Sequence, residues 1–439
     1  MSSLSGQGAV TDTVISQAVN VLPTPFYLYD EALLEEKCRQ VLNMPNAFGL
    51  KVSYAMKANS NRAILQIVHR LGFHIDASSL NEVRRAMLAG IPVQDIMLTT
   101  QEVPLGDDRR DMEKLMLEGL KYNVCSLLQL ELIAGFASQH KLPLSIRIHP
   151  GVGTGESESR NTGDKYASFG VHQSDLDKVM ALAREKSLVF DTVHNHIGSG
   201  GDPLEWRDNI DRELAVLEKW FPDAETINLG GGFKEARMPD ETAVDVEQLG
   251  IFAREHIEAF YKRTGRKLLT EVEPGTYIIA NACYLVTSVI DKKHTGADGF
   301  KFLILDGGME SSTRPLLYGS RHPFYVVSKE GTLLSSEFDL AALDPVNDLR
   351  VVAGRCCETG DTQCLDDHGH VTPRLLADPG IGDYVVIGGM GAYCSAMALH
   401  NYNSYGQSPE LLLFRDGSYQ VIRVPQSVEQ MTVNERGLE

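Results

Sequence analysis

The feature that most constrains the fold is a regular alternation of strand-like and helix-like segments between about residues 30 and 280. VSYAM (52–56) is short, β-branched and aromatic, whereas NRAILQIVHRLG (61–72) has apolar residues at helical spacing and ends in glycine. Such pairs recur about every 25–40 residues. This spacing predicts parallel strands joined by helices, and about eight strands within ~250 residues predict a closed (β/α)8 barrel. The further strand-like runs are FHIDAS, DIMLT, YNVCS, LSIRIHP (144–150), TVHNHIGSG (192–200), TINLGGG (226–232) and LLTEVEPG (268–275).

The pattern changes after about residue 285. Runs such as FKFLILDGG, PFYVVSKEGTL and DYVVIGGMGAY are strands separated by turns, with few helical segments between them. This pattern predicts an antiparallel β-domain. We therefore expect an α/β protein with a barrel over residues 30–285 and a C-terminal antiparallel β-domain over residues 286–439, joined by a strand from residues 1–29.

Composition excludes several classes of protein. Lys and Arg number 41 against 59 Asp and Glu, so the net charge of −18, without a basic block, argues against a nucleic-acid partner. The chain has no secretory signal at its start and no apolar run of membrane-spanning length. Seven cysteines, an odd number without a CxxC motif, argue against a disulfide framework and against a metal site. We expect a cytoplasmic protein with reduced thiols and no membrane association.

Unusual residues stand where predicted barrel strands end, which is where barrel enzymes place their chemistry. Lys57 follows the strand VSYAM, and crowding there could make it a nucleophilic amine. Glycine runs at 198–200 and 230–232 follow two other strands and could bring backbone N–H groups close to a phosphate. Taken alone, each feature is better explained as an ordinary exposed lysine or as turn glycines. Two glycine runs at barrel-strand ends together favour a phosphate site.

Two further candidates stand at strand ends. His196 precedes the first glycine run, and is either a core histidine or a ring that stacks on a flat cofactor. Glu273 begins EPGTY, and is either an ion-pair partner or a carboxylate that contacts a pyridine nitrogen and makes the ring an electron sink. A reactive amine, a phosphate cradle and such a carboxylate together meet the needs of pyridoxal phosphate.

A set of motifs stands in a fixed order along the chain: YAMKAN (54–59), HIGSG (196–200), GGGF (230–233), EPG (273–275), RPLLYG (314–319), CETGD (357–361) and GAYCSAM (391–397) with YN (402–403). This ordered set resembles the fold-type III pyridoxal-phosphate decarboxylases, most closely those acting on meso-diaminopimelate. The resemblance covers nearly the whole chain, from PTPFYLYD to LLLFRDG. It implies the alanine racemase and ornithine decarboxylase-like fold, the cofactor pyridoxal 5′-phosphate, and conversion of meso-diaminopimelate to L-lysine and CO2 in lysine biosynthesis.

The resemblance also implies roles for individual residues. Lys57 would bind the cofactor covalently and His196 would stack on its ring. The phosphate would be held by Ser199, the glycines Gly230, Gly231 and Gly232, and Tyr393. Glu273 would contact the pyridine nitrogen. The residues predicted to be catalytic are Lys57, Glu273 and the proton donor Cys357.

The substrate's distal end would be held by Arg314 and Tyr318, which bind its carboxylate. Cys357, the proton donor, and Glu358, which grips the distal ammonium, would come from a second subunit. The resemblance therefore implies a homodimer with shared active sites and a small amino-acid substrate.

Three positions depart from the family pattern. The usual arginine after EPG is Thr276 here, and the usual lysine of a Ser-Lys-Phe-Gly stretch is Ser168. Arg355 adds a cation before Cys356, where the family usually has Gly-Pro-Leu or similar before Cys-Glu. Arg355 could replace the missing arginine at the substrate's distal carboxylate, or the substrate could have a different distal end.

Two alternatives remain open on these residues. One is a decarboxylase for another substrate, such as an acylated or carrier-bound amino acid or a siderophore or toxin precursor. The other is a non-catalytic homologue that binds pyridoxal phosphate, which the intact Lys57, Glu273, Cys357 and Tyr393 argue against. Alanine racemase shares the barrel but faces the pyridine nitrogen with an arginine, so Glu273 favours decarboxylation.

Overall fold

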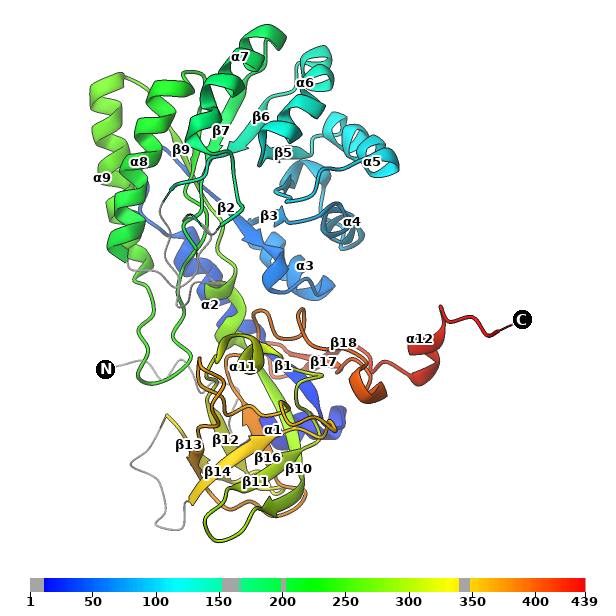
Figure 1. Cartoon of the computed structure of the whole chain (residues 1–439). Coiled ribbons are helices and arrows are strands. Elements are labelled where there is room, and N and C mark those ends of the chain that lie inside the picture. Colours follow the sequence, from blue (N-terminus) through cyan, green and yellow to red (C-terminus); the bar gives the residue numbers. More distant parts are fainter. Residues whose placement is uncertain (1–11, 152–164, 166, 199–202, 339–347, 439) are drawn as a thin grey trace. The chain divides into compact units, whose positions relative to one another are not determined.

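The chain folds into two units. The computed structural model describes residues 12–151, 165, 167–198, 203–338 and 348–438 (Figure 1). One unit comprises Glu35–Glu235 and Ala243–Tyr277, and the other comprises Met1–Leu34, Ala236–Thr242 and Ile278–Glu439. The short segment Ala236–Thr242 thus leaves the first unit soon after the glycine run and belongs to the second.

The first unit is a closed barrel of parallel strands, as the alternating pattern predicts. Each strand pairs with the next along the chain, and the last returns to the first through the register Leu50↔Thr270. Because all strands run the same way, their carboxyl ends meet at one end of the barrel. The strands are β2 (Leu50–Ala55), β3 (His74–Ala77), β4 (Ile96–Leu98), β5 (Lys121–Val124), β6 (Leu144–Arg147), β7 (Phe190–His194), β8 (Thr226–Asn228) and β9 (Leu269–Val272).

Helices connect these strands and form the outer layer (Figure 1). Their starts are set by capping residues: the side chains of Asn61, Ser79, Ser126 and Asp245 each accept a backbone N–H of the first turn. The helices of the barrel unit are α3 (Arg62–Arg70), α4 (Leu80–Leu88), α5 (Gly106–Leu117), α6 (Leu127–His140), α7 (Leu176–Lys186), α8 (Pro203–Trp220) and α9 (Val246–Thr264). The residues of α2 (Glu31–Leu42) and α10 (Thr276–Ile279) are divided between the two units. Short 3-10 turns cover Met56–Ala58 (η1), Val93–Asp95 (η2), Gln173–Asp175 (η4), Ala280–Ala282 (η5) and Tyr402–Ser404 (η7).

The second unit is built on a ten-stranded sheet with the central order β13-β12-β16-β10-β1-β17-β18. It is mixed rather than purely antiparallel, because β1 pairs in parallel with β17 and β11 with β14. Parallel pairing needs a long connection, which the intervening chain supplies in both cases. The strands are β1 (Phe26–Asp30), β10 (Cys283–His294), β11 (Lys301–Leu305), β12 (Phe324–Val327), β13 (Leu333–Ser336), β14 (Asp348–Ala353), β15 (Arg374–Leu376), β16 (Tyr384–Ile387), β17 (Glu410–Leu413) and β18 (Tyr419–Arg423).

Helix α1 (Asp12–Val21) covers one face of this sheet. Its buried residues Ile15 and Ala18 pack with Phe26, Tyr284 and Val386 in one apolar cluster. Each large apolar side chain buried in this way contributes about 1.5–3 kcal/mol. Two short helices, α11 (Arg314–Tyr318) and α12 (Val428–Thr432), complete the unit. Over the described ranges, no helix combines the length and apolarity that crossing a membrane would require.

Candidate active site

Lys57 lies at the carboxyl end of β2, in the turn η1. Its neighbours Met56 and Ala58 are buried, whereas Lys57 itself is exposed. The end of β2 is tied to the EPG segment by a hydrogen bond from the Ala55 N–H to the Pro274 carbonyl, at 3.2 Å. The chain therefore presents one amine at the barrel mouth on a rigid support.

The glycines after β8 could not be replaced by larger residues without moving the backbone. Gly230 and Gly232 have φ of +65° and +91°, and a Cβ on Gly232 would lie 2.3 Å from the Gly198 carbonyl oxygen. A Cβ on Gly231 would lie 2.4 Å from the Glu273 carbonyl oxygen. Gly198 and the 230–232 run thus lie close together, while Ser199 and Gly200 lie outside the described residues.

Glu273 follows β9, with its backbone N–H donating to the Gly230 carbonyl at 2.7 Å. Its side chain is buried. The Asn228 Nδ2 donates to Oε1 at 2.7 Å, and the His194 Nε2 lies 3.3 Å from Oε2. Burial first, and then the nearby Asp76 carboxylate, raise the pKa of Glu273 well above its usual value. A cationic partner at this carboxylate would offset both effects.

His196 lies half-buried beside the glycine run. The Gly231 N–H donates to its Nδ1 at 3.1 Å. Burial, followed by the charges of Arg147 and Lys57, lowers the pKa of His196 well below its usual value. The ring is therefore a neutral, fixed plane, as a stacking partner requires.

The sequence reasoning missed two charged residues inside the barrel. Asp76 in β3 is 2% exposed and Arg147 in β6 is 7% exposed. Asp76 Oδ1 and Arg147 Nε have no hydrogen-bond partner among the residues the structure describes. Buried charges are rare unless they are paired or functional. A charged residue within a short predicted barrel strand, as in HIDA and LSIR, was therefore the available signal.

The predicted substrate residues lie in the second unit. Arg314 begins α11 and is 6% exposed; its guanidinium carbon lies 5.7 Å from the centre of the Tyr318 ring, and its Nη2 donates to Ser320 Oγ at 3.2 Å. Arg314 Nε has no hydrogen-bond partner within the described ranges. A buried guanidinium with a remaining donor fits a carboxylate ligand.

The two residues predicted to serve a second subunit are exposed. The Cys357 N–H donates to Asn403 Oδ1 at 2.7 Å, which leaves the thiol on the surface. The Tyr402 hydroxyl donates to Glu358 Oε2 at 3.3 Å. Tyr393, on the loop after β16, is half-buried and has a φ of +58°.

Arg355 has partners within its own unit. Its Nε donates to Glu310 Oε1 at 3.0 Å, and its guanidinium carbon lies 3.9 Å from the centre of the Tyr405 ring. Glu310 also lies near Cys356 and Asp361, with potential ligand atoms within 4.8 Å of one another. The oxygens of both carboxylates already accept hydrogen bonds, including backbone N–H groups, so this cluster supports the CETGD loop.

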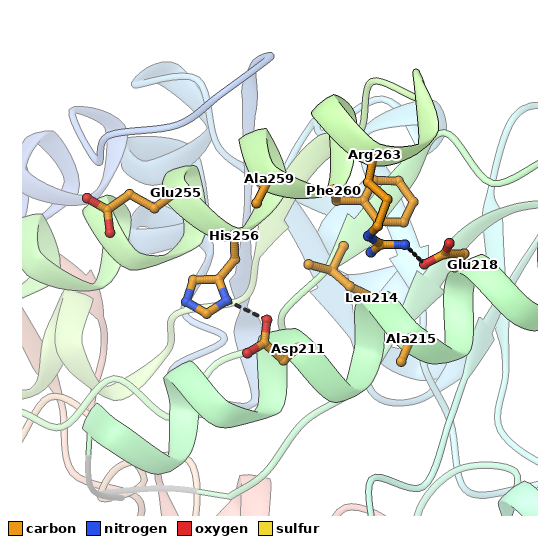
Figure 2. Close-up of a pocket in the computed structure, with 9 residues that line it drawn as sticks. All are labelled: Asp211, Leu214, Ala215, Glu218, Glu255, His256, Ala259, Phe260 and Arg263. Atoms are coloured by element: carbon orange, nitrogen blue, oxygen red, sulfur yellow. Dashed lines mark hydrogen bonds and ion pairs between the residues drawn. The ribbon is translucent and has the colours of Figure 1, made fainter.

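A surface pocket lies elsewhere, between α8 and α9 on the outside of the barrel (Figure 2). Figure 2 shows two ion pairs across it, His256 with Asp211 and Arg263 with Glu218. None of its lining residues is a predicted site residue. These two ion pairs connect α8 with α9.

The glycine run gives a direct prediction. Gly232→Ala should weaken pyridoxal-phosphate binding by about tenfold or more, because the new Cβ must push the loop away from Gly198. Equilibrium dialysis of the cofactor against the apo chain measures this. Gly265→Ala is the matched control, since Gly265 also has a positive φ, +74°, but no atom within 4 Å of its Cβ position. Equal affinity for the two variants would contradict the assignment of the cradle.

The residues at the barrel mouth fit pyridoxal phosphate. Each polar group of this cofactor has a suitable partner here. The amine of Lys57 suits its aldehyde, the glycine run suits its phosphate, and the buried carboxylate of Glu273 suits its ring nitrogen. The unpartnered Asp76 Oδ1 and Arg147 Nε provide further polar atoms for a polar ring. These are the residues that would hold the cofactor.

The comparisons with known proteins agree with this chemistry. Residues 32–280 match the family described as pyridoxal-dependent decarboxylase, pyridoxal binding domain. The chain is 30% identical over 414 residues to the diaminopimelate decarboxylase of Escherichia coli K12, covering 93% of this chain and 92% of that one. A crystal structure of a diaminopimelate decarboxylase superposes with a TM-score of 0.87 at 27% identity, covering 98% of both chains.

A second solved structure extends the likeness. The diaminopimelate decarboxylase of Helicobacter pylori, complexed with L-lysine, matches with a TM-score of 0.79 and 26% identity, covering 96% of this chain and 99% of that one. The family match covers more than half of the chain, and the E. coli relative covers nearly all of it. Sequence, fold and site chemistry therefore agree, and the chain belongs to the pyridoxal-dependent decarboxylases.

Proposed function

We propose that this enzyme removes one carboxylate of meso-diaminopimelate, giving L-lysine and CO2. The observation that carries the choice of substrate is Arg314, a buried guanidinium whose Nε is left for a ligand beside the Tyr318 ring. A distal carboxylate on the substrate would meet this need. The relatives that share nearly the whole chain with it bear the name of this activity.

The cofactor and this chain's residues divide the work. When bound, pyridoxal phosphate supplies the electron sink that stabilises the negative charge left on the substrate's Cα as CO2 departs. Lys57 would hold the cofactor through its amine, the glycine run and Tyr393 would hold its phosphate, and His196 would cover its ring. Glu273 would accept a hydrogen bond from the protonated ring nitrogen and so keep the proton there.

The final step is proton delivery to Cα. We assign it to the thiol of Cys357, whose proton replaces the lost carboxylate while Glu358 binds the distal ammonium. Both side chains are exposed on the second unit. Their exposure supports a homodimer in which each CETGD loop serves the partner's barrel, and we propose this assembly for a cytoplasmic enzyme.

Thr276 stands where the family usually has an arginine, and we infer that Arg237, rather than Arg355, supplies the second cation of the substrate site. Arg237 is 7% exposed, and its Nε donates to the Gly389 carbonyl at 3.1 Å. The adjacent Gly388 carbonyl accepts a hydrogen bond from His322 Nδ1 at 3.0 Å. The charges of Arg237 and Arg314 act together on His322, where burial and then these two cations lower the pKa well below its usual value.

We therefore propose that Arg237 and Arg314 together hold the distal carboxylate. Arg355, by contrast, is the ionic partner of Glu310, whose side chain is fully buried. Removing Arg355 would leave a buried carboxylate without its cation, which costs stability.

Two variants separate these roles. Arg237→Gln should lower kcat/KM for meso-diaminopimelate by about tenfold or more, since a charge-assisted hydrogen bond is worth roughly 1.5–3 kcal/mol. Turnover of L-ornithine, which lacks that carboxylate, should change much less. Arg355→Gln should lower the thermal stability and affect both substrates alike. A selective loss with Arg355→Gln, and none with Arg237→Gln, would instead assign the distal site to Arg355.

Release of CO2 from a panel of amino acids tests the function itself. Meso-diaminopimelate should be turned over faster than lysine and ornithine. Negligible release from meso-diaminopimelate, with rapid release from another amino acid such as an acylated one, would overturn the proposed substrate and leave the family and cofactor in place.

A further inference from the structure

A ring of polar side chains lines the inside of the barrel near its carboxyl end. It connects neighbouring strands through side-chain contacts, and apart from Glu273 none of its members has yet been given a role. All except Thr99 are at least nine-tenths buried. The members of this polar ring are Thr99, Asn123, Ser145, His194, Asn228 and Glu273.

The hydrogen bonds of Asn123 determine which way its amide points. Ser145 Oγ donates to Asn123 Oδ1 at 2.9 Å, so the carbonyl side of the amide is occupied. The amide nitrogen therefore faces Thr99 Oγ1 at 3.1 Å and His194 Nδ1 at 2.7 Å. An amide nitrogen only donates, so Nδ1 of His194 must accept.

His194 consequently carries its proton on Nε2. Burial, followed by the charge of Arg147, lowers the pKa of His194 well below its usual value, so the ring is neutral and has one N–H. That Nε2 has no hydrogen-bond partner among the described residues, and it lies within ion-pair distance of Glu273 Oε2, at 3.3 Å. The tautomer set by Asn123 thus places an unpartnered N–H next to the carboxylate, where a small shift would complete a hydrogen bond.

The other oxygen of Glu273 is held from the opposite side. Asn228 Nδ2 donates to Oε1 at 2.7 Å, and Asn228 Oδ1 in turn accepts the Gly230 N–H at 2.9 Å. Donors to a carboxylate favour its ionised form, against the burial and the neighbouring Asp76 that favour the protonated form.

We propose that His194, with its tautomer set by Asn123, is a positioning residue that keeps Glu273 ionised and in one orientation as the partner of the cofactor's ring nitrogen. The inference rests on the family's cofactor and on the role proposed for Glu273. It does not depend on which amino acid is decarboxylated, so its test is independent of the substrate.

The test compares two cofactors on the apo chain. One is pyridoxal phosphate, and the other is its analogue with a C–H group in place of the ring nitrogen. His194→Met removes the N–H and should weaken binding of pyridoxal phosphate by roughly tenfold or more, the scale of a hydrogen bond to a charged group. Binding of the analogue should not change, because it has no ring nitrogen for Glu273.

Two further variants complete this comparison. His194→Gln retains an N–H donor and should restore most of the affinity for pyridoxal phosphate. Thr192→Val is the matched control, since Thr192 is fully buried two residues earlier on the same strand and should affect neither cofactor. Equal weakening of both cofactors by His194→Met would show a purely structural role, and unchanged affinity for pyridoxal phosphate would equally overturn the proposal.

The tautomer can be measured directly in the wild-type chain. Nitrogen-15 chemical shifts of labelled histidine should show Nε2 protonated and Nδ1 accepting in His194, with the signal assigned by its loss in His194→Gln. Asn123→Leu should remove the preference for this tautomer. A wild-type His194 protonated on Nδ1 would overturn the inference, even if the Met variant fails to fold.

Discussion

Lys57→Ala should abolish decarboxylation, with a loss of at least about 10³-fold in kcat, the scale expected when a residue that bonds covalently to the reacting group is removed. Lys57 is the amine that the barrel exposes at the end of β2, between the buried Met56 and Ala58. The side chain is exposed and is not part of the buried core of the barrel. The variant should therefore fold and still bind pyridoxal phosphate, only more weakly.

Borohydride reduction identifies the attachment site. Reduction of the wild-type enzyme should fix the cofactor irreversibly to the peptide that contains Lys57, as read by mass spectrometry, and the same treatment of Lys57→Ala should fix none. Lys178→Ala is the control, because Lys178 is an exposed residue of α7 paired with Asp175. An adduct on another lysine, or full activity in Lys57→Ala, would refute the assignment.

The barrel was predictable because its signals are local. Helices such as Arg62–Arg70 show apolar residues at helical spacing, begin at an Asn or Ser cap and stop near a glycine. Because parallel strands all end on the same side of a barrel, the residues after each predicted strand lie at its mouth. The sequence therefore predicts this position for Lys57 and Glu273 without knowledge of their neighbours.

The polar ring could not be predicted in the same way. Asn123, Ser145 and His194 come from three strands, and their contacts depend on the stagger of those strands around the barrel. A single polar residue in a short strand is compatible with either face. The tautomer of His194 depends in addition on an amide orientation that only the assembled network determines.

The ion pair of Arg355 shows another limit of local reasoning. Its place before Cys356 predicts a substrate contact, whereas the contact with Glu310 could not be predicted, because Glu310 lies 45 residues earlier in the chain and meets Arg355 only through folding. The mixed character of the sheet has the same origin, since β1 and β17 pair across almost the whole length of the chain. Long-range pairs of this kind leave no periodic signal.

Mixing two inactive variants should restore activity if each active site is shared between subunits. Lys57→Ala lacks the amine and Cys357→Ala lacks the proton donor, so either homodimer is inactive. In a heterodimer, the intact Lys57 of one chain meets the intact Cys357 of the other at one of the two sites. Random exchange of subunits makes half of all dimers heterodimers. Each heterodimer has one native site out of two, so about a quarter of the wild-type activity should return.

The exposed positions of Cys357 and Glu358 are the reason to expect a shared active site. Cys357 and Glu358 are exposed, although a proton donor must be shielded from water to act on Cα, so an additional surface has to cover them. The Cys357 backbone is anchored by Asn403 and the Glu358 side chain by Tyr402, so the loop is formed before any partner binds.

The control combines both substitutions in one chain. Mixing the Lys57→Ala, Cys357→Ala double variant with the wild type produces heterodimers whose two sites each lack one group, so they should be inactive. Subunit exchange is verified in every mixture by mass-tagged chains. If exchange is complete and the two single variants still show no activity together, Lys57 and Cys357 act within one chain, and the exposed CETGD loop must be covered by its own barrel instead.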